Sequence, residues 1–220
     1  LMEDPPQSTK KWKKAFILDS DKNLSKVKIR HRGDAARNWA YEKKSWRLKA
    51  PKKNLFGRVR IYNYGISKHE TLLENYISYY IGRRAGVLSP RSRMVELFIN
   101  EAPYGVYNEF EHIDESFLRN NEIMPVNIYK GEQMYNERHL TVNPLLFHNP
   151  SLWQKISTFN RAPEDDFSDL IYFLNLIREA ETSSDSFERL KQVARIEDWA
   201  LFSAYQTLVQ SWHNNSYHNQ

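Results

Sequence analysis

The spacing of apolar residues changes twice along this chain of 220 residues. Near the N-terminus, apolar residues alternate with charged ones, as at Trp46 and Leu48. A period of two is typical of half-buried strands, whereas a period near 3.6 is typical of helices. Residues 70–85 follow the helical period, residues 94–111 return to the strand period, and the last third is helical again. This order predicts an α+β fold with a sheet-rich first part and a helical second part.

Shorter stretches of the same two kinds refine the prediction. Gly86 is expected to end the helix over 70–85, because glycine favours the conformation that stops a helix. Asp185 is expected to cap a helix over 186–194, since aspartate accepts the first backbone N–H groups. Further strands are predicted at 16–18, 27–29, 46–48, 59–62 and 127–130, turns at 19–23 and 100–103, and helices over 167–177 and 197–210.

The predicted domain organisation has three parts. Residues 1–10, which contain two prolines, are expected to be a disordered lead-in. Residues 11–130 form the sheet-rich part, with its one helix at about 70–85. Residues 131–220 begin with a long irregular excursion and continue as helices, and this last part is expected to be incomplete.

The composition excludes several classes of protein. Apolar residues make up 40% and charged residues 27%, which is typical of a soluble globular chain. No apolar run reaches the roughly 20 residues that a membrane span needs. The chain has no Cys, so disulfides, thiolate metal sites and a Cys nucleophile are excluded. It starts at Leu1 without a signal peptide, and we therefore expect it to be a fragment.

The charge is distributed unevenly along the sequence. Residues 1–60 hold 18 Lys and Arg against 6 Asp and Glu, whereas the remaining 160 hold 14 against 21. A basic N-terminal part suggests a polyanionic partner such as a nucleotide, a nucleic acid or an acidic substrate, although a solvated basic surface is an equal alternative. A nucleic acid is the least favoured partner, because the aromatic residues fall at core-like periods rather than among the basic ones.

Familiar catalytic motifs are absent, and the remaining signal is a set of spaced pieces. There is no Walker loop, no GxGxxG, no GxSxG and no HExxH. Lys44 could reach nucleotide phosphates or could be an ordinary exposed strand lysine. Glu111 could pair with a lysine or could line a solvated edge. His213 and His218 are five residues apart, which does not suit a metal pair on one helix, so a loop is the favoured interpretation.

Taken in order, these pieces resemble the CotH kinase family, the atypical protein kinase-like proteins first known from bacterial spore coats. The resemblance runs from about residue 13 to the last residue. It rests on Arg30-His31-Arg32-Gly33, Lys43-Lys44-Ser45-Trp46-Arg47-Leu48-Lys49, Gly86-Val87-Leu88-Ser89-Pro90, Val95-Glu96-Leu97-Phe98-Ile99-Asn100, Tyr104-Gly105-Val106-Tyr107 with Glu111, Ile113-Asp114 and Phe117-Leu118, and Ile128-Tyr129-Lys130-Gly131.

The resemblance implies a protein-kinase-like fold, with a sheet-rich N-lobe and a helical C-lobe. It also implies ATP with a divalent metal, Mg²⁺ or Mn²⁺, between the lobes. Lys44, or its neighbour Lys43, is then the phosphate-binding lysine, and Glu111 lies near the nucleotide. Arg32 and Lys130 are weaker candidates for contacts with phosphate or the cleft.

The last residues depart from the family pattern. The resemblance places a metal-binding Asn at Asn219, but Asn214 or Asn215 stands where the catalytic Asp is expected. An amide cannot accept a proton as a carboxylate does. The chain also stops at Gln220, before the strand pair that carries the family's second metal ligand. We therefore expect this chain alone not to transfer phosphate at a useful rate.

Two functions follow from the resemblance. The first is an ATP-dependent protein kinase that phosphorylates Ser or Thr of a coat or surface protein. The second is a non-catalytic pseudokinase module of a coat or cell-surface assembly. Either protein would be exported to the spore coat or cell surface, and its partners would be a nucleotide and a protein substrate or assembly partner.

Overall fold

The computed structural model describes residues 11–33, 42–56, 58–66, 73–131, 146–156 and 163–209. They belong to two compact units, Leu1–Ile123 and Met124–Gln220, and each unit is described by itself below. The architecture is mixed α+β, as the sequence predicted: a six-stranded antiparallel sheet comes first and helices follow. The predicted lead-in over residues 1–10 lies outside the described residues.

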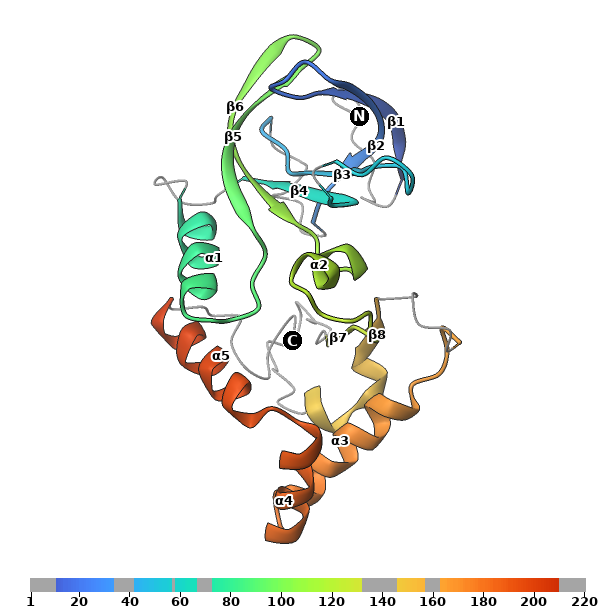
Figure 1. Cartoon of the computed structure of the whole chain (residues 1–220), viewed down its shortest axis with the longest axis vertical. Coiled ribbons are helices and arrows are strands. Elements are labelled where there is room, and N and C mark those ends of the chain that lie inside the picture. The colour runs from blue at the N-terminus through green and yellow to red at the C-terminus, as the bar shows by residue number, and fades with distance from the viewer. Residues whose placement is uncertain are drawn as a thin grey trace. The chain divides into compact units, whose positions relative to one another are not determined.

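The first unit is built on one curled sheet, shown in blue to green in Figure 1. Its strand order is β1-β2-β3-β4-β6-β5, and every neighbouring pair is antiparallel. The prediction that residues 94–111 form a hairpin is confirmed, and the predicted strand at 59–62 begins two residues later. The strands are β1 (Lys13–Leu18), β2 (Leu24–His31), β3 (Trp46–Lys49), β4 (Ile61–Gly65), β5 (Ser92–Ile99) and β6 (Ala102–Glu111).

The predicted turns join these strands. In the β1–β2 turn, the Asp19 carboxylate accepts hydrogen bonds from the backbone N–H groups of Asp21 and Asn23, at 2.9 and 2.8 Å. In the β5–β6 turn, Asn100 and Glu101 both have positive φ angles, 51° and 68°. Asparagine tolerates this left-handed conformation better than most residues, which fits its place at the turn.

The alternating pattern places the core on one face of the sheet. The buried residues of this face come from β2, β3, β4 and β6, and we call it the core face. Trp46 lies directly opposite Tyr64, and Leu48 lies opposite Tyr62. Its buried cluster is Val27, Trp46, Leu48, Tyr64 and Tyr107. Residues between these positions point to the other face, because neighbouring side chains of a strand alternate.

Two helices accompany the sheet (Figure 1). Helix α1 (Glu74–Arg84) confirms the helix predicted at 70–85, and Gly86 ends it with a φ of 86°. Helix α2 (Glu115–Asn120) directly follows β6, and the sequence analysis missed it because it has only six residues. Its local signal is Asp114, whose carboxylate accepts the backbone N–H groups of Ser116 and Phe117.

The second unit is mainly helical. Leu146 is fully buried beside Gly131, where an added Cβ would lie 3.1 Å from the leucine methyl groups. Asp169 accepts hydrogen bonds from Asn127 and Tyr129, and so ties the strand β7 to helix α3. The described elements are β7 (Tyr129–Gly131), short 3-10 helices at Leu146–His148 and Pro150–Leu152, β8 (Trp153–Lys155), α3 (Ser168–Ala180), α4 (Ser184–Val193) and α5 (Ile196–Leu208).

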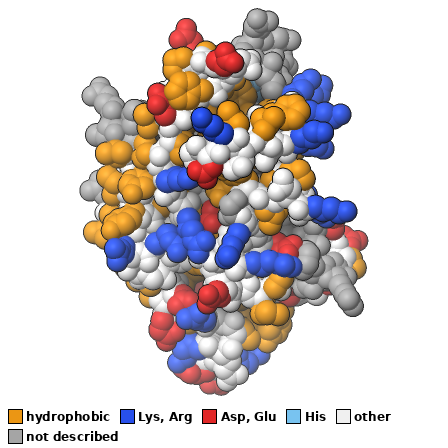
Figure 2. All heavy atoms as spheres, turned by 45° about the horizontal axis from the view of Figure 1, so that its top comes forward, with side chains coloured by type: hydrophobic (Ala, Val, Ile, Leu, Met, Phe, Trp, Pro, Cys, Tyr) orange, Lys and Arg blue, Asp and Glu red, His pale blue; other side chains and the backbone are white. Residues whose placement is uncertain are grey.

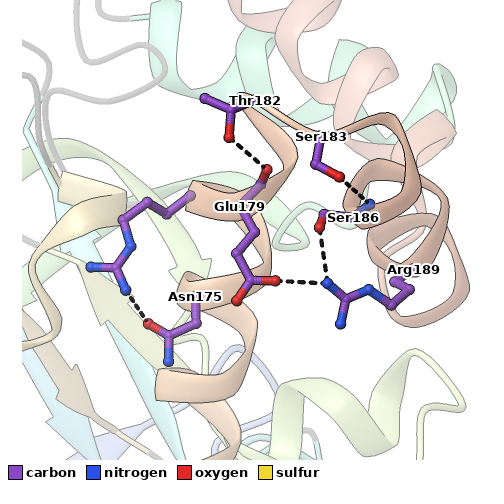
Figure 3. Close-up of polar contacts among 7 residues, drawn as sticks. Asn175, Glu179, Thr182, Ser183, Ser186 and Arg189 are labelled. Atoms are coloured by element: carbon purple, nitrogen blue, oxygen red, sulfur yellow. Dashed lines mark hydrogen bonds and ion pairs between the residues drawn. The ribbon is translucent and has the colours of Figure 1, made fainter.

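The start of α4 corrects one prediction. The residue that caps this helix is Ser183, not Asp185, because Ser183 has an extended backbone and its hydroxyl accepts the N–H of Ser186 at 3.3 Å (Figure 3). Asp185 lies inside the first turn, where a negative charge favours the positive end of the helix dipole. Arg189 then joins α4 to Glu179 of α3 at 2.7 Å.

Candidate functional site

The face of the sheet opposite the core face carries a concentration of positive charge. Lys28 and Arg30 flank a core residue of β2, and Arg47 and Lys49 flank a core residue of β3. The register sets Lys28 directly opposite Lys49, and Arg30 directly opposite Arg47. We call these four residues the basic face. Like charges in directly opposite positions destabilise a sheet.

A buried amide orients one member of the basic face. The Nε of Arg47 donates a hydrogen bond of 2.8 Å to Oδ1 of Asn63, on the neighbouring strand β4. Asn63 is only 2% exposed and lies opposite Phe110 of β6. The ring of Tyr79 in α1 packs against Phe110, with the ring centres 5.2 Å apart. Four residues are therefore directly opposite one another across the sheet, namely Arg30, Arg47, Asn63 and Phe110. The last of them packs against helix α1.

An aromatic ring makes cation–π contacts with two members of the basic face. The guanidinium of Arg30 lies 4.8 Å from the ring centre of Trp12, and the amine of Lys49 lies 5.5 Å from it. Burial lowers the pKa of Lys49, the positive charges of Arg60, Lys28 and Arg30 lower it further, and Asp114 partly opposes them. These positive charges repel one another, so a bound anion would relieve the repulsion.

The basic face continues into a hollow of about 580 Å³ near the β1 edge. Half of its lining residues are cations, and the other half are apolar, among them Phe16 and Val27. On the surface seen in Figure 2, Lys and Arg side chains form clusters that adjoin hydrophobic ones. A hollow lined by one sign of charge concentrates ligands of the opposite sign. The cations are Lys14, Lys26, Lys28, Lys49 and Arg60.

The core face carries the carboxylates, and each has partners. Glu109 is 5% exposed, its Oε1 lies 2.6 Å from Nε of Arg93, and Tyr64 hydrogen-bonds to it. Glu111 is 3% exposed and accepts hydrogen bonds from the backbone N–H of Arg91 at 3.0 Å and from Nδ2 of Asn120 at 3.2 Å. Glu111 therefore joins β6 to the start of β5 and to the end of α2.

Tyrosines beside these carboxylates are held neutral. Burial raises the pKa of Tyr62 to about 12, and the charges of Glu109 and Glu111 add to the effect. Burial and the hydrogen bond with Glu109 also raise the pKa of Tyr64. A hollow of about 810 Å³ lies over Tyr62 and both carboxylates and reaches the β1–β2 turn.

The lysines predicted to bind phosphate occupy a buried segment before β3. Nζ of Lys43 donates to the carbonyl of Val106 at 2.7 Å and lies 4.9 Å from the ring centre of Tyr107, and burial lowers its pKa. Lys44 is 6% exposed. These contacts tie the Lys43 segment to the β5–β6 hairpin, and the phosphate-binding role of both lysines stays a prediction.

The structure does not place Lys44 and Glu111 on neighbouring strands. Strand β4 lies between β3 and β6, and Glu111 shares a row with Tyr62 and Leu48. Lys44 is four residues before Leu48, which corresponds to about 13 Å along an extended strand. If Lys44 and Glu111 both contact the nucleotide, it has to span that length of the sheet.

The other predicted site residues are spread over both units. The guanidinium of Arg32 lies 4.8 Å from the ring centre of Phe110, the residue of β6 that lies opposite Asn63. Lys130 lies in β7 of the second unit, opposite Gln154. Asn214, Asn215 and Asn219 lie outside the described residues.

Metal binding and membrane insertion can be judged only for the described part of the chain. There, three or more His, Cys, Asp or Glu side chains do not come together as a metal site, so we derive no step through Mg²⁺ or Mn²⁺. Likewise, every described helix is too short or too polar to cross a bilayer.

The sequence analysis recognised a basic N-terminal part but not the residues that form its face. The missed residues are Lys28, Arg30, Arg47 and Lys49, and they do leave a signal. Basic residues recur at every second position over 26–30 and again over 47–49. Two alternating basic stretches that pair as strands put all their charges on one face when the register sets the basic positions opposite each other, as it does here. Only their pairing, which the sequence did not give, shows that they face one another.

Comparison with known proteins identifies the family. No curated protein matches the chain. A model described as CotH kinase protein matches residues 29–220. The matched span includes Arg30, Arg47, Lys49 and Asn63, whereas strand β1 lies before it. Since the match covers most of the chain, this protein belongs to the CotH kinase family.

Proposed function

We propose that this chain is part of an ATP-dependent protein kinase whose basic face binds the phosphates of the nucleotide. The observation that carries the proposal is the pairing of like charges, Lys28 opposite Lys49 and Arg30 opposite Arg47. This arrangement costs stability in the empty protein and becomes favourable when an anion lies across it. Membership of a kinase family supplies the class of anion, a nucleoside triphosphate.

The members of the basic face have different tasks in this proposal. Arg47, oriented by Asn63, presents a planar guanidinium that can donate two parallel hydrogen bonds to one phosphate. Lys28 and Lys49 act as point charges. Phosphoryl transfer depends mainly on positioning and on neutralising charge, and these are the contributions that the described residues can make.

The identity of the phosphate acceptor follows from the family resemblance. The acceptor in this proposal is a Ser or Thr of a coat or surface protein, and the chain acts outside the cytoplasm. The asparagines at 214 and 215 favour a second candidate, a kinase-like module that binds nucleotide without transferring phosphate. The two differ in one measurement: with the family's C-terminal segment supplied, the first transfers radiolabel from ATP with its own asparagines at 214 and 215, whereas the second transfers none unless Asp replaces one of them.

The nucleotide site is tested by titrating the chain with a fluorescent ATP analogue. Arg47→Ala should weaken binding by about 10- to 100-fold, because a hydrogen bond to a charged group contributes roughly 1.5–3 kcal/mol. Arg178→Ala, an exposed arginine of α3, is the matched control and should leave the affinity unchanged. Equal affinities for the chain and for Arg47→Ala would show that the phosphates bind elsewhere.

A further inference from the structure

The hairpin of β1 and β2 exposes large apolar side chains. Phe16 is 63% exposed, Leu18 63% and Leu24 66%. The register sets Leu18 directly opposite Leu24, and it sets Phe16 opposite Lys26. Single exposed apolar residues are ordinary, but three adjoining ones at the end of a hairpin mark a surface that can be covered by a partner.

Strand β1 is also an edge of the sheet. It pairs with β2 on one side, and among the described strands none pairs with its other side. An edge strand presents backbone N–H and C=O groups on which a further strand can form. Peptides that bind in this way gain affinity from the main chain and specificity from the side chains at alternate positions.

The side chains along β1 specify the chemistry of the partner. On the exposed side, Lys14, Phe16 and Leu18 follow one another at alternate positions. Lys13 precedes them, and neither lysine forms an ion pair within the described residues. A strand beside β1 would therefore place acidic residues against the two lysines and apolar residues against Phe16 and Leu18.

Charge disfavours two other occupants. Residues 11–28 hold six lysines and two aspartates, so the hairpins of two copies would repel each other. A lipid surface is disfavoured because Asp19 and Asp21 form the turn beyond Leu18 and Leu24, and inserting the leucines would carry both carboxylates toward the bilayer.

We propose that the exposed edge of β1 is a docking site for an extended segment of another protein, apolar at one end and acidic at the other, which adds a seventh strand to the sheet. The family match begins at residue 29, after β1, so this surface lies outside the part of the chain that the match covers. The docking proposal does not depend on nucleotide binding, although Lys14 and Phe16 also line the hollow beside the basic face.

The test is fluorescence anisotropy with a labelled peptide of about twelve residues, whose first half alternates Val and Thr and whose second half is rich in Glu. Two control peptides carry Lys in place of Glu, or Pro at alternate positions, which removes backbone donors. We expect saturable binding of the first peptide and at least about tenfold weaker binding of both controls.

Protein variants locate the site on β1. Phe16→Ser with Leu18→Ser should weaken peptide binding by about tenfold or more. The matched control is Phe98→Ser with Val106→Ser, an exposed apolar pair on the β5–β6 hairpin, which should change binding less than about twofold. Lys13→Glu with Lys14→Glu should reverse the preference toward the Lys peptide.

Several results would overturn the proposal. These are absence of saturable binding at about 1 mM peptide, equal binding of the Pro peptide, or equal losses in the two double-Ser variants. A concentration-dependent dimer that Leu18→Ser dissolves would assign the edge to a second copy. Binding to phosphatidylserine vesicles that Leu18→Ser abolishes would assign it to a membrane.

Discussion

The two faces of the sheet differ in the surroundings of their charged residues. On the core face, Glu109 and Glu111 are almost fully buried, and each carboxylate has hydrogen-bond donors from neighbouring elements. On the basic face, positive charges are more exposed and lie opposite other positive charges. Buried charges with partners belong to the architecture of the fold, because burying them without partners is costly. On the basic face, by contrast, directly opposite like charges reduce the stability of the sheet, and the proposed ligand would offset that cost.

The comparison also changes how the acid singled out by the sequence is understood. Glu111 was expected near the nucleotide, and its observed contacts are to the backbone of Arg91 and to Asn120. These contacts hold the end of β6 against the beginning of β5 and the end of α2. The hydrogen bonds of Glu111 therefore show a structural role, whereas a role at the nucleotide stays a prediction.

The largest expected effect is on the core face. Glu111→Ala should lower the free energy of unfolding by about 3 kcal/mol, because two partly buried donors lose a charged acceptor. Urea denaturation measures the loss. Glu115→Ala, which removes a partly exposed ion pair with Arg119 within α2, should cost only about 0.5 kcal/mol. Similar losses in both variants would show that Glu111 is not part of the architecture.

The next effect concerns the tyrosine beside the carboxylates. Burial raises the pKa of Tyr62 to about 12, so folding favours its neutral form. Its contribution to stability is complete below pH 10, the ordinary value, and is lost as the pH rises toward 12. Tyr62→Phe should therefore lose less stability than the parent chain between pH 10 and 12. If the free energy of unfolding fell equally for Tyr62→Phe and for the parent chain between pH 10 and 12, that result would contradict the burial of this phenol.

A smaller effect tests how the basic face is organised. Asn63→Ala should weaken nucleotide binding by about fivefold, because Arg47 loses the hydrogen bond that orients it, a contribution of roughly 1 kcal/mol. In a double-mutant cycle, Asn63→Ala should add little to the loss caused by Arg47→Ala. Fully additive losses would mean that Asn63 acts independently of Arg47.

The smallest effect separates the two faces most sharply. Lys28→Thr should raise the free energy of unfolding of the empty protein by about 0.5 kcal/mol, because it removes a like-charge pair with Lys49. The same change should weaken nucleotide binding. Lys26→Thr is the matched control, since Lys26 lies opposite Phe16 rather than another cation, and it should give no such gain. A destabilised Lys28→Thr would remove the argument that this face is kept for a ligand.

The sequence predicted the elements better than it predicted their ends and caps. Long periodic segments, such as the hairpin over 94–111 and the helix ended by Gly86, were confirmed. The six-residue helix α2 was missed, and the cap of α4 proved to be Ser183. Periodicity averages over many residues, whereas a cap depends on the backbone conformation of one residue, which neighbouring serines and aspartates can all supply.

The sequence by itself determined which residues share a face, because side-chain direction in a strand follows from position alone. It therefore determined that Arg47 and Lys49 oppose the core residue Leu48, and its motifs determined the family. Only the tertiary structure decided that Arg30 faces Arg47. It also decided that Glu111 aligns with Leu48 across the sheet, four residues along the chain from Lys44. Strand order and register depend on contacts between residues distant in the sequence, and a local pattern does not encode them.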